Sequence, residues 1–204
     1  MARSCGFERE QKLEQAMELF WQKGFANTSV ADLVAHLGIN RFSLYNSFGD
    51  KQKLYEEALA HYFTHVTQRH LQPLRQPGAG LAQLEQFLRH FEQRQQENPF
   101  GCFIQNAVVE HAGRDAKVQA QGERLFSELQ AALTAAIANG QQAGEVTRAF
   151  SAAALADLLL VQIQGMRVLG KARRYEDIGR AVACLLQLLR VKGEPLACAD
   201  ASAP

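Results

Sequence analysis

The chain has 204 residues, of which 47% are hydrophobic, and its 22 Lys and Arg nearly balance its 21 Asp and Glu. That length is enough for a large buried core, in one domain or in two modest ones. The apolar fraction excludes an intrinsically disordered chain, and the near-neutral charge excludes a strongly basic polymer-binding tail.

The N-terminus and the cysteines favour a cytoplasmic protein. Residues 1–15 reach charged side chains early and contain no apolar segment followed by a cleavage site, so we expect no export. The four cysteines are widely spaced and form no Cys/His group at metal-ligand distances, so we expect reduced thiols, no metal and no cofactor. The most apolar stretch, 152–169, carries two charged and two amide side chains, which predicts a buried helix and no membrane partner.

Helical periodicity runs through nearly the whole chain, and no stretch alternates apolar and polar residues over the length of a strand. The predicted fold is therefore all-α. We expect a first helix over 7–23 that stops at Gly24, a second that opens on the S-x-x-D capping box of Ser29 and Asp32 and ends near Leu37, a short third over 41–47, and a fourth after Asp50.

The second half of the chain continues with longer helices. The stretch 72–80 is dense in Pro and Gly and predicts a loop or a helix break. Beyond it we expect helices near 80–97, 101–113, 115–139, 149–170 and 174–191. The predicted division is a domain of the first three helices over 1–50, a larger helical domain over 51–192, and a flexible tail over 193–204.

The second and third predicted helices are joined through Leu37-Gly38-Ile39-Asn40, in which glycine can take the positive φ of a tight connection. A helix pair joined in this way is a helix-turn-helix. At about 100° per residue, Leu44 and Phe48 of the third helix face inward. The outward face then holds Arg41, Phe42, Tyr45 and Asn46.

This outward face has the chemistry that the edges of a DNA major groove accept. Arg can bond guanine, Asn can bond adenine, and an aromatic ring can touch the thymine methyl group. Lys51 and Lys53 stand at the start of the next helix, where they suit phosphate groups. The pattern therefore predicts a DNA reader.

The charge of the region leaves an alternative open. Residues 1–60 hold 7 Lys and Arg against 8 Asp and Glu, a net charge of −1, which is unfavourable for DNA binding. Short Gly-linked helix pairs also occur in all-α proteins that bind no DNA. The alternative is a small-molecule carrier in which the helix pair is only structural.

The residues from Ala16 to Leu54 read A-x-x-L-F-x-x-x-G-F-x-x-T-S-V-x-D-L-V-x-x-L-G-I-N-R-x-S-L-Y-x-x-F-x-x-K-x-x-L. This pattern resembles the N-terminal DNA-binding region of the TetR family of bacterial transcription regulators. The resemblance covers about residues 8–60. It implies a three-helix DNA-binding head, a fourth helix that links it to a ligand-binding domain, dimerisation through the last two long helices, and DNA contacts at Thr28, Asn40, Arg41, Phe42, Tyr45, Asn46 and Lys51.

The last two long helices also predict a homodimer from their own composition. The helix near 149–170 is apolar nearly all round, and the one near 174–191 carries Ile178, Val182, Leu185, Leu186, Leu188 and Leu189. Helices of this kind need more than one partner to bury them, and a second copy of the chain supplies it. A two-fold dimer predicts a pseudo-palindromic operator.

An effector cavity is expected among the helices between about 60 and 170. The candidates are aromatic residues, scarce polar groups and one thiol: Phe63, Phe91, Cys102, Phe103, Asn106, Glu110, Gln162 and Met166. Each aromatic can equally be plain core. Cys102 follows Asn98-Pro99 and lies near the start of a helix, where the thiol is either a sensor of oxidants or a small packing residue.

Two further patterns limit the function. His61 and His65 stand at i, i+4, a spacing that can bind metal, but no acidic or thiol partner is near in sequence, so we predict no metal site. The chain contains no G-x-S-x-G, no H-E-x-x-H and no phosphate-binding glycine loop. The prediction is a ligand-responsive transcriptional regulator, without catalytic activity, that a small-molecule effector releases from its DNA.

Overall fold

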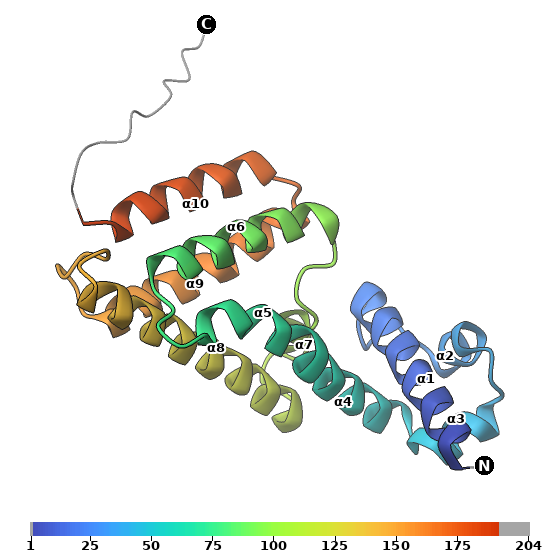
Figure 1. Cartoon of the computed structure of the whole chain (residues 1–204). Coiled ribbons are helices and arrows are strands. Elements are labelled where there is room, and N and C mark those ends of the chain that lie inside the picture. Colours follow the sequence, from blue (N-terminus) through green and yellow to red (C-terminus); the bar gives the residue numbers. More distant parts are fainter. Residues whose placement is uncertain (1, 192–204) are drawn as a thin grey trace, which may run out of the picture.

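The computed structural model describes residues 2–191, with side chains from Glu8 onward, and the elements in this range are helices joined by turns and loops. No strand occurs in it; an isolated antiparallel bridge joins Val146 and Arg190. The all-α prediction is confirmed. Figure 1 shows three short-linked helices at one end, a connecting helix, and a larger bundle at the other end.

The N-terminal head consists of α1 (Ala2–Lys23), α2 (Val30–Leu37) and α3 (Arg41–Phe48). Helix α1 begins five residues before the predicted 7 and ends at Gly24, whose φ of 82° is the left-handed stop expected there. The capping box of Ser29 and Asp32 opens α2, as predicted, and Asn40 caps α3.

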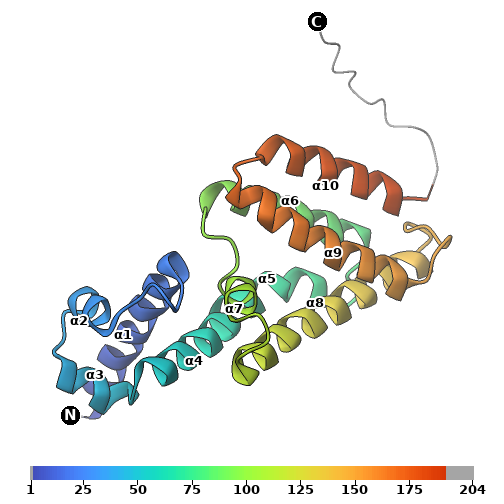
Figure 2. The same ribbon diagram turned by 180° about the vertical axis from the view of Figure 1, so that it is seen from behind.

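Helix α4 (Lys51–Tyr62) leaves the head and runs into the body (Figures 1 and 2). It continues without a break into a π-helical segment (Phe63–Thr67) and α5 (Gln68–Leu71). The predicted loop starts later than residue 72, because Gln72–Arg75 forms a 3₁₀ turn with Pro73 in its first positions.

The body contains α6 (Leu81–Glu97), α7 (Phe103–His111), α8 (Ala116–Gln142), α9 (Ala152–Lys171) and α10 (Tyr175–Leu189). Helix α8 is the longest at 27 residues and packs on α4 and α7 at its start and on α9 along its length. In Figure 2, α6, α9 and α10 lie together at the end of the body away from the head.

The buried side chains form two hydrophobic cores. The first joins the head to α4, to α7 and to the start of α8, with Tyr55 fully buried in it. The second is built by the 3₁₀ turn Gln72–Arg75, α6, the rest of α8, α9 and α10. The head and α4 therefore share one core across residue 50, where the predicted domain division falls. The predicted tail over 193–204 lies outside the described residues.

Candidate nucleic-acid interface and effector cavity

Helix α3 buries one side and presents the other, as predicted. Leu44 is fully buried and Phe48 is 3% exposed. On the outward side Arg41 and Asn46 are exposed, as are Phe42 at 73% and Tyr45 at 42%. The exposed Phe42 ring lies here among donors suited to base edges.

The position of α3 is fixed by its caps and by the turn before it. The Asn40 side chain accepts the Ser43 N–H at 2.8 Å, so this amide holds the start of α3. Gly38 has φ 62° and the Ile39 N–H donates to the Val34 carbonyl, which closes α2. Leu33, Leu37 and Leu44 then pack in one core and hold the two helices at a fixed angle.

Two of the seven predicted DNA-contact residues lie differently from the prediction. Thr28 is fully buried and its hydroxyl donates to the Gly24 carbonyl at 2.6 Å, so it holds the α1–α2 turn and cannot face DNA. The Lys51 ammonium lies 4.2 Å from the centre of the Phe25 ring, a cation–π contact. Burial lowers the pKa of Lys51, while Glu110 and Asp32 oppose that shift. Lys53 is the exposed lysine at the start of α4.

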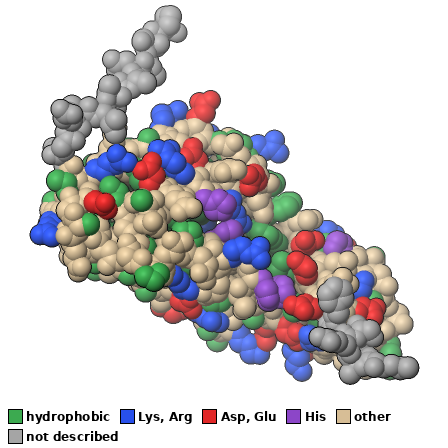
Figure 3. Space-filling view, viewed as in Figure 1, with side chains coloured by type: hydrophobic (Ala, Val, Ile, Leu, Met, Phe, Trp, Pro, Cys, Tyr) green, Lys and Arg blue, Asp and Glu red, His purple; other side chains and the backbone are tan. Residues whose placement is uncertain are grey.

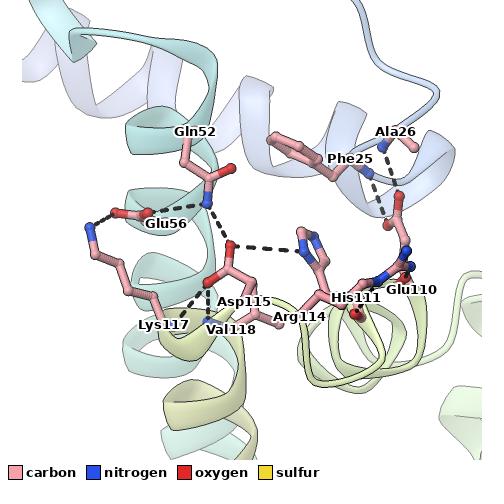
Figure 4. Close-up of polar contacts among 10 residues, drawn as sticks. All are labelled: Phe25, Ala26, Gln52, Glu56, Glu110, His111, Arg114, Asp115, Lys117 and Val118. Carbon is pink, nitrogen blue, oxygen red and sulfur yellow. Dashed lines mark hydrogen bonds and ion pairs between the residues drawn. The ribbon is translucent and has the colours of Figure 1, made fainter.

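The end of α7 is hydrogen-bonded to the turn between α1 and α2 (Figure 4). The Glu110 carboxylate accepts the Phe25 N–H at 3.0 Å and the Ala26 N–H at 2.7 Å. Gly24 leaves the room for it, because a Cβ there would lie 2.9 Å from Glu110 Oε2. Glu110 is predicted as an effector ligand, but in this structure its carboxylate joins the body to the head.

The start of α8 is joined to α4 by a hydrogen bond and an ion pair in the same region (Figure 4). Asp115 caps α8 and accepts the Gln52 side-chain N–H at 2.7 Å, while Lys117 pairs with Glu56 at 2.6 Å. Hydrogen bonds, first from the Val118 N–H, hold the pKa of Asp115 below its usual value. The corner between α7 and α8 therefore contacts both the head and the helix that carries it.

A cavity of about 60 Å³ lies where the two cores meet. That is room for about two water molecules. Its wall is formed by side chains from α4, the π segment, α5, α6, the start of α7, α8 and α9: Tyr62, Thr67, His70, Leu71, Phe87, His90, Phe91, Arg94, Gln95, Gly101, Cys102, Leu125, Leu129 and Arg167.

The polar groups of this cavity are basic or neutral. Burial, together with Arg94 and His90, lowers the pKa of His70 to about 3, so this imidazole is neutral at neutral pH. Burial also lowers the pKa of Arg94, which stays a cation because guanidinium starts from a very high value. In Figure 3, His and Lys/Arg side chains gather on the surface between α5 and α6. Among the residues that the structure describes, no carboxylate lines the cavity.

Of the eight predicted effector residues, only Phe91 and Cys102 line this cavity. Phe63 and Phe103 are core residues, and the Arg124 guanidinium covers the Phe63 ring at 3.9 Å. The Asn106 amide donates to the Phe100 carbonyl at 2.8 Å, away from the cavity. Gln162 is half-buried on α9 outside the cavity wall, and Met166 is buried in the second core.

The missed residues carry a signal in the sequence. The missed His90, Arg94 and Gln95 share one face of α6 with Phe87 and the predicted Phe91, at offsets i, i+3, i+4, i+7 and i+8. That face mixes aromatic rings with basic and amide groups. A plain core helix does not contain such a mixture, so the face could have been identified from spacing alone.

Cys102 is the N-cap residue of α7 and is 5% exposed. Its thiol lies beside the Tyr62 hydroxyl, and burial together with this thiol raises the pKa of Tyr62. The thiol is therefore a wall group of the cavity that solvent hardly reaches.

The fold places an acidic residue beside His61 and His65, which lie one helical turn apart. Glu10 of α1 lies beside His61 and His65, and one ligand atom of each residue lies within 4.8 Å of the others. The two imidazole rings stack with their centres 4.0 Å apart. The partner was missed because it comes from more than fifty residues away in sequence.

Helix α9 keeps an apolar outer face. Leu158, Val161 and Val168 are 46%, 66% and 61% exposed, and Leu188 of α10 is 63% exposed. By length and composition α9 could also cross a membrane, with a mean hydropathy of 1.4, but its other side packs in the second core. This face needs an apolar partner.

A helix-turn-helix whose second helix is capped and turned outward is the arrangement found in DNA-binding proteins of the helix-turn-helix class. Residues 13–58 match the family described as "Bacterial regulatory proteins, tetR family". Residues 80–183, which are 104 of the 204, match "Tetracyclin repressor-like, C-terminal domain". The chain belongs to the TetR family of bacterial transcriptional regulators.

Individual relatives agree with this assignment. The HTH-type transcriptional repressor ComR of Escherichia coli K12 is 26% identical over 195 residues, 93% of this chain and 88% of ComR. A TetR regulator from Chloroflexus aurantiacus J-10-FL has the same fold, with a TM-score of 0.82, 23% identity, and coverage of 93% of this chain and all of that one.

A third relative has been solved on DNA. The regulator CifR, as a cysteine mutant complexed with 26-bp double-strand operator DNA, is 26% identical with a TM-score of 0.70, covering 88% of this chain and 95% of that one. The chain is thus a ligand-responsive DNA-binding transcriptional regulator of a family that does not consist of enzymes, and the carrier alternative is not favoured.

Proposed function

We propose that the protein is a homodimeric repressor, acting in the cytoplasm, that binds a palindromic operator through α3 and leaves it when a small-molecule effector enters the body. The observation that carries this proposal is the outward face of α3, where Arg41, Phe42, Tyr45 and Asn46 are exposed side by side. Base edges in a major groove are the partners that fit this set of groups.

The dimer is supported by the apolar outer faces of α9 and α10. Leu158, Val161 and Val168 lie at i, i+3 and i+10 on α9, and Gly165 lies among them with no atom near the place of its missing Cβ. A stripe of this kind on two adjacent helices buries itself best against its own copy around a two-fold axis. The two α3 helices of such a dimer read half-sites about one DNA turn apart.

The way in which an effector could act on DNA binding follows from the contacts around the cavity. Tyr62 at the end of α4 and Cys102 at the start of α7 both line the cavity. The other ends of α4 and α7 carry Gln52 and Glu110, which hold the α7–α8 corner to α4 and to the α1–α2 turn. A ligand that separates α4 from α7 at the cavity would therefore move the head.

The cavity as described is too small for a whole effector, so the ligand-bound body must be wider. An effector that prefers the wider body shifts the dimer away from the DNA-binding arrangement. The shift can be no larger than the difference between its affinities for the two states.

The test is selection of bound fragments from the organism's own genomic DNA, at two salt concentrations, by the wild type and by the Arg41→Ala, Tyr45→Ala double variant. We expect the wild type alone to enrich a short palindrome. If both proteins retain the same fragments, or neither enriches any, the reading role of α3 is wrong.

A further inference from the structure

We propose that the effector is a small organic anion, a carboxylate with an apolar tail, whose charged group sits on Arg94 and Arg167 in the cavity between the two cores. This inference rests on the proposed function, because it names the chemical class of the ligand for the same cavity. It is drawn from the charges, the free donors and the shape of the site.

The Arg94 guanidinium is the central group. Its side chain is mostly buried, and none of the described residues gives it an ion pair or a side-chain hydrogen bond. A guanidinium has five N–H donors and no acceptor, so leaving them unused in a buried place is unfavourable. A carboxylate is the group that such a fork binds with two parallel hydrogen bonds.

Arg167 of α9 supplies a second cation in the same wall. It donates to the Gln164 side chain at 2.8 Å, and its guanidinium carbon lies 5.8 Å from the centre of the Phe91 ring. The carboxylate that acts electrostatically on Arg94 is that of Glu97. Glu97 is exposed and does not line the cavity. Two cations without an internal counter-ion favour a ligand that brings the negative charge itself.

The shape separates a place for the charged group from a place for the tail. The inner cavity of about 60 Å³ suits a carboxylate and little more. A more open groove of about 500 Å³ adjoins it and shares Phe87, His70 and His90 with its wall. Pro73 and Phe87 supply apolar surface in this groove, whose wall also holds Arg69 and Arg89.

His70 and His90, which line both the inner cavity and the open groove, favour an uncharged or anionic ligand. Their ring centres lie 5.6 Å apart between α5 and α6. Each imidazole can donate one hydrogen bond to a carboxylate oxygen as it passes. An ammonium or guanidinium ligand would instead meet Arg94 and Arg167 with no acid to balance it.

The experiment measures binding of butyrate and hexanoate, with butyramide and hexanamide as matched neutral probes, by calorimetry on the full chain. We expect hexanoate to bind at least tenfold more tightly than hexanamide. Arg94→Gln and, in a separate protein, Arg167→Gln should each weaken hexanoate at least tenfold, while Arg180→Gln on the exposed face of α10 should leave it within twofold.

Equal binding of hexanoate and hexanamide, or no binding of either acid to the wild type, would overturn the anion proposal, whatever the state of the variants. The failure of the proposed function has a different signature. If hexanoate binds through Arg94 but leaves operator affinity unchanged, the ligand class stands and the effector role falls.

A different cluster carries a second inference: Glu10, His61 and His65 form a divalent cation site that joins α1 to the end of α4. The three ligand atoms lie within 4.8 Å of one another, on two helices that pack together. Two imidazoles, one carboxylate and a water are a common zinc ligand set. A bound ion would draw the three atoms closer and fasten the head to α4.

The local structure orients the histidines for this role. The π-helical segment that contains His65 starts directly after α4, and such segments occur often at functional sites. His65 Nδ1 lies 3.0 Å from the His61 carbonyl oxygen, to which it can donate. That hydrogen bond leaves Nε2 of His65 as the nitrogen that can bind a metal.

Calorimetric titration of the metal-free chain with Zn²⁺ tests this site. We expect saturable binding that Glu10→Gln and His65→Ala each weaken at least tenfold; both side chains are exposed, so neither change threatens the fold. Glu18→Gln on the same helix is the matched control. Identical titrations for the wild type and both variants would exclude the site.

Discussion

The proposed DNA-reading side of α3 and the cavity of the body differ in how the chain builds them. The first comes from Arg41 to Asn46, six consecutive residues on one helix held by Asn40 and Gly38. The second takes side chains from seven segments between Tyr62 and Arg167. A site built by one short helix is fixed by local offsets, whereas a site built by seven segments depends on the tertiary fold.

The most severe way to break the first region is the Arg41→Ala, Tyr45→Ala double variant. It removes base-edge contacts worth about 1–3 kcal/mol each, so operator affinity should fall roughly a hundredfold or more. Fluorescence anisotropy on the selected operator measures the loss, and circular dichroism should show an unchanged fold because both side chains are exposed. Arg173→Ala, far from α3, should change nothing. Full affinity of the double variant would contradict the assignment of α3.

The proposed dimer would link the two regions, and a charge on the apolar face of α9 should separate the subunits. We expect Val161→Glu, Val168→Glu to sediment as a monomer at micromolar concentration and to lose operator binding by about the same hundredfold, because one half-site is lost. Sedimentation velocity checks this. Val109→Glu, at a valine on α7 that is equally exposed at 71%, should remain a dimer. A dimeric double variant would place the interface elsewhere.

Two glycines with positive φ allow a test of the contact between the body and the head. Gly24 and Gly38 have φ of 82° and 62°, so alanine at either costs about 1 kcal/mol in strain. Only at Gly24 would the new Cβ meet Glu110, at 2.9 Å, whereas no atom lies within 4 Å at Gly38. We therefore expect Gly24→Ala to lose about 2–3 kcal/mol and Gly38→Ala about 1 kcal/mol in urea unfolding. Equal losses would mean that the Glu110 contact does not form.

Glu110→Gln tests the same contact with a smaller change. It replaces two charge-assisted hydrogen bonds to the Phe25 and Ala26 N–H groups with one neutral acceptor, at a cost of about 1–2 kcal/mol. The effector should also release this variant from DNA less completely than the wild type. Glu123→Gln, whose carboxylate bonds Ser127 on its own helix, serves as the comparison. Unchanged stability and unchanged release would show that Glu110 does not transmit effector binding from the cavity to the head.

The smallest expected effect is a pH dependence that comes from the cavity. The pKa of His70 is about 3 in the folded chain, below its ordinary 6.5, so below pH 6.5 the unfolded chain takes up a proton that the folded chain does not. Stability therefore falls as the pH falls, by about 1 kcal/mol between pH 6.5 and pH 5 after allowance for the partly exposed ring. His70→Gln should flatten this slope in thermal melts; a slope equal to that of the wild type would mean that His70 titrates normally.

The sequence predicted most of what depends on local offsets. The helix limits, the capping box at Ser29 and the outward turn of Arg41, Phe42, Tyr45 and Asn46 follow from periods and caps within a few residues. Thr28 was the local exception, because its hydroxyl finds the Gly24 carbonyl one turn back and turns inward.

The cavity could not be predicted in the same way, since its residues meet only through packing. Glu110 and Asn106 share a face of α7 as predicted. The Glu110 carboxylate, however, accepts a hydrogen bond from the head, and the Asn106 amide donates one to the Phe100 carbonyl. Glu10 reaches His61 and His65 because α1 packs on α4. The α6 face from Phe87 to Gln95 is the part of the cavity that spacing could have identified.

The most direct test of the central claim is hydroxyl-radical footprinting of the wild type on its selected operator. We predict two protected half-sites, related by a two-fold axis and centred about one DNA turn apart, as a dimer with one α3 in each major groove requires. A single protected patch without two-fold symmetry would contradict the account.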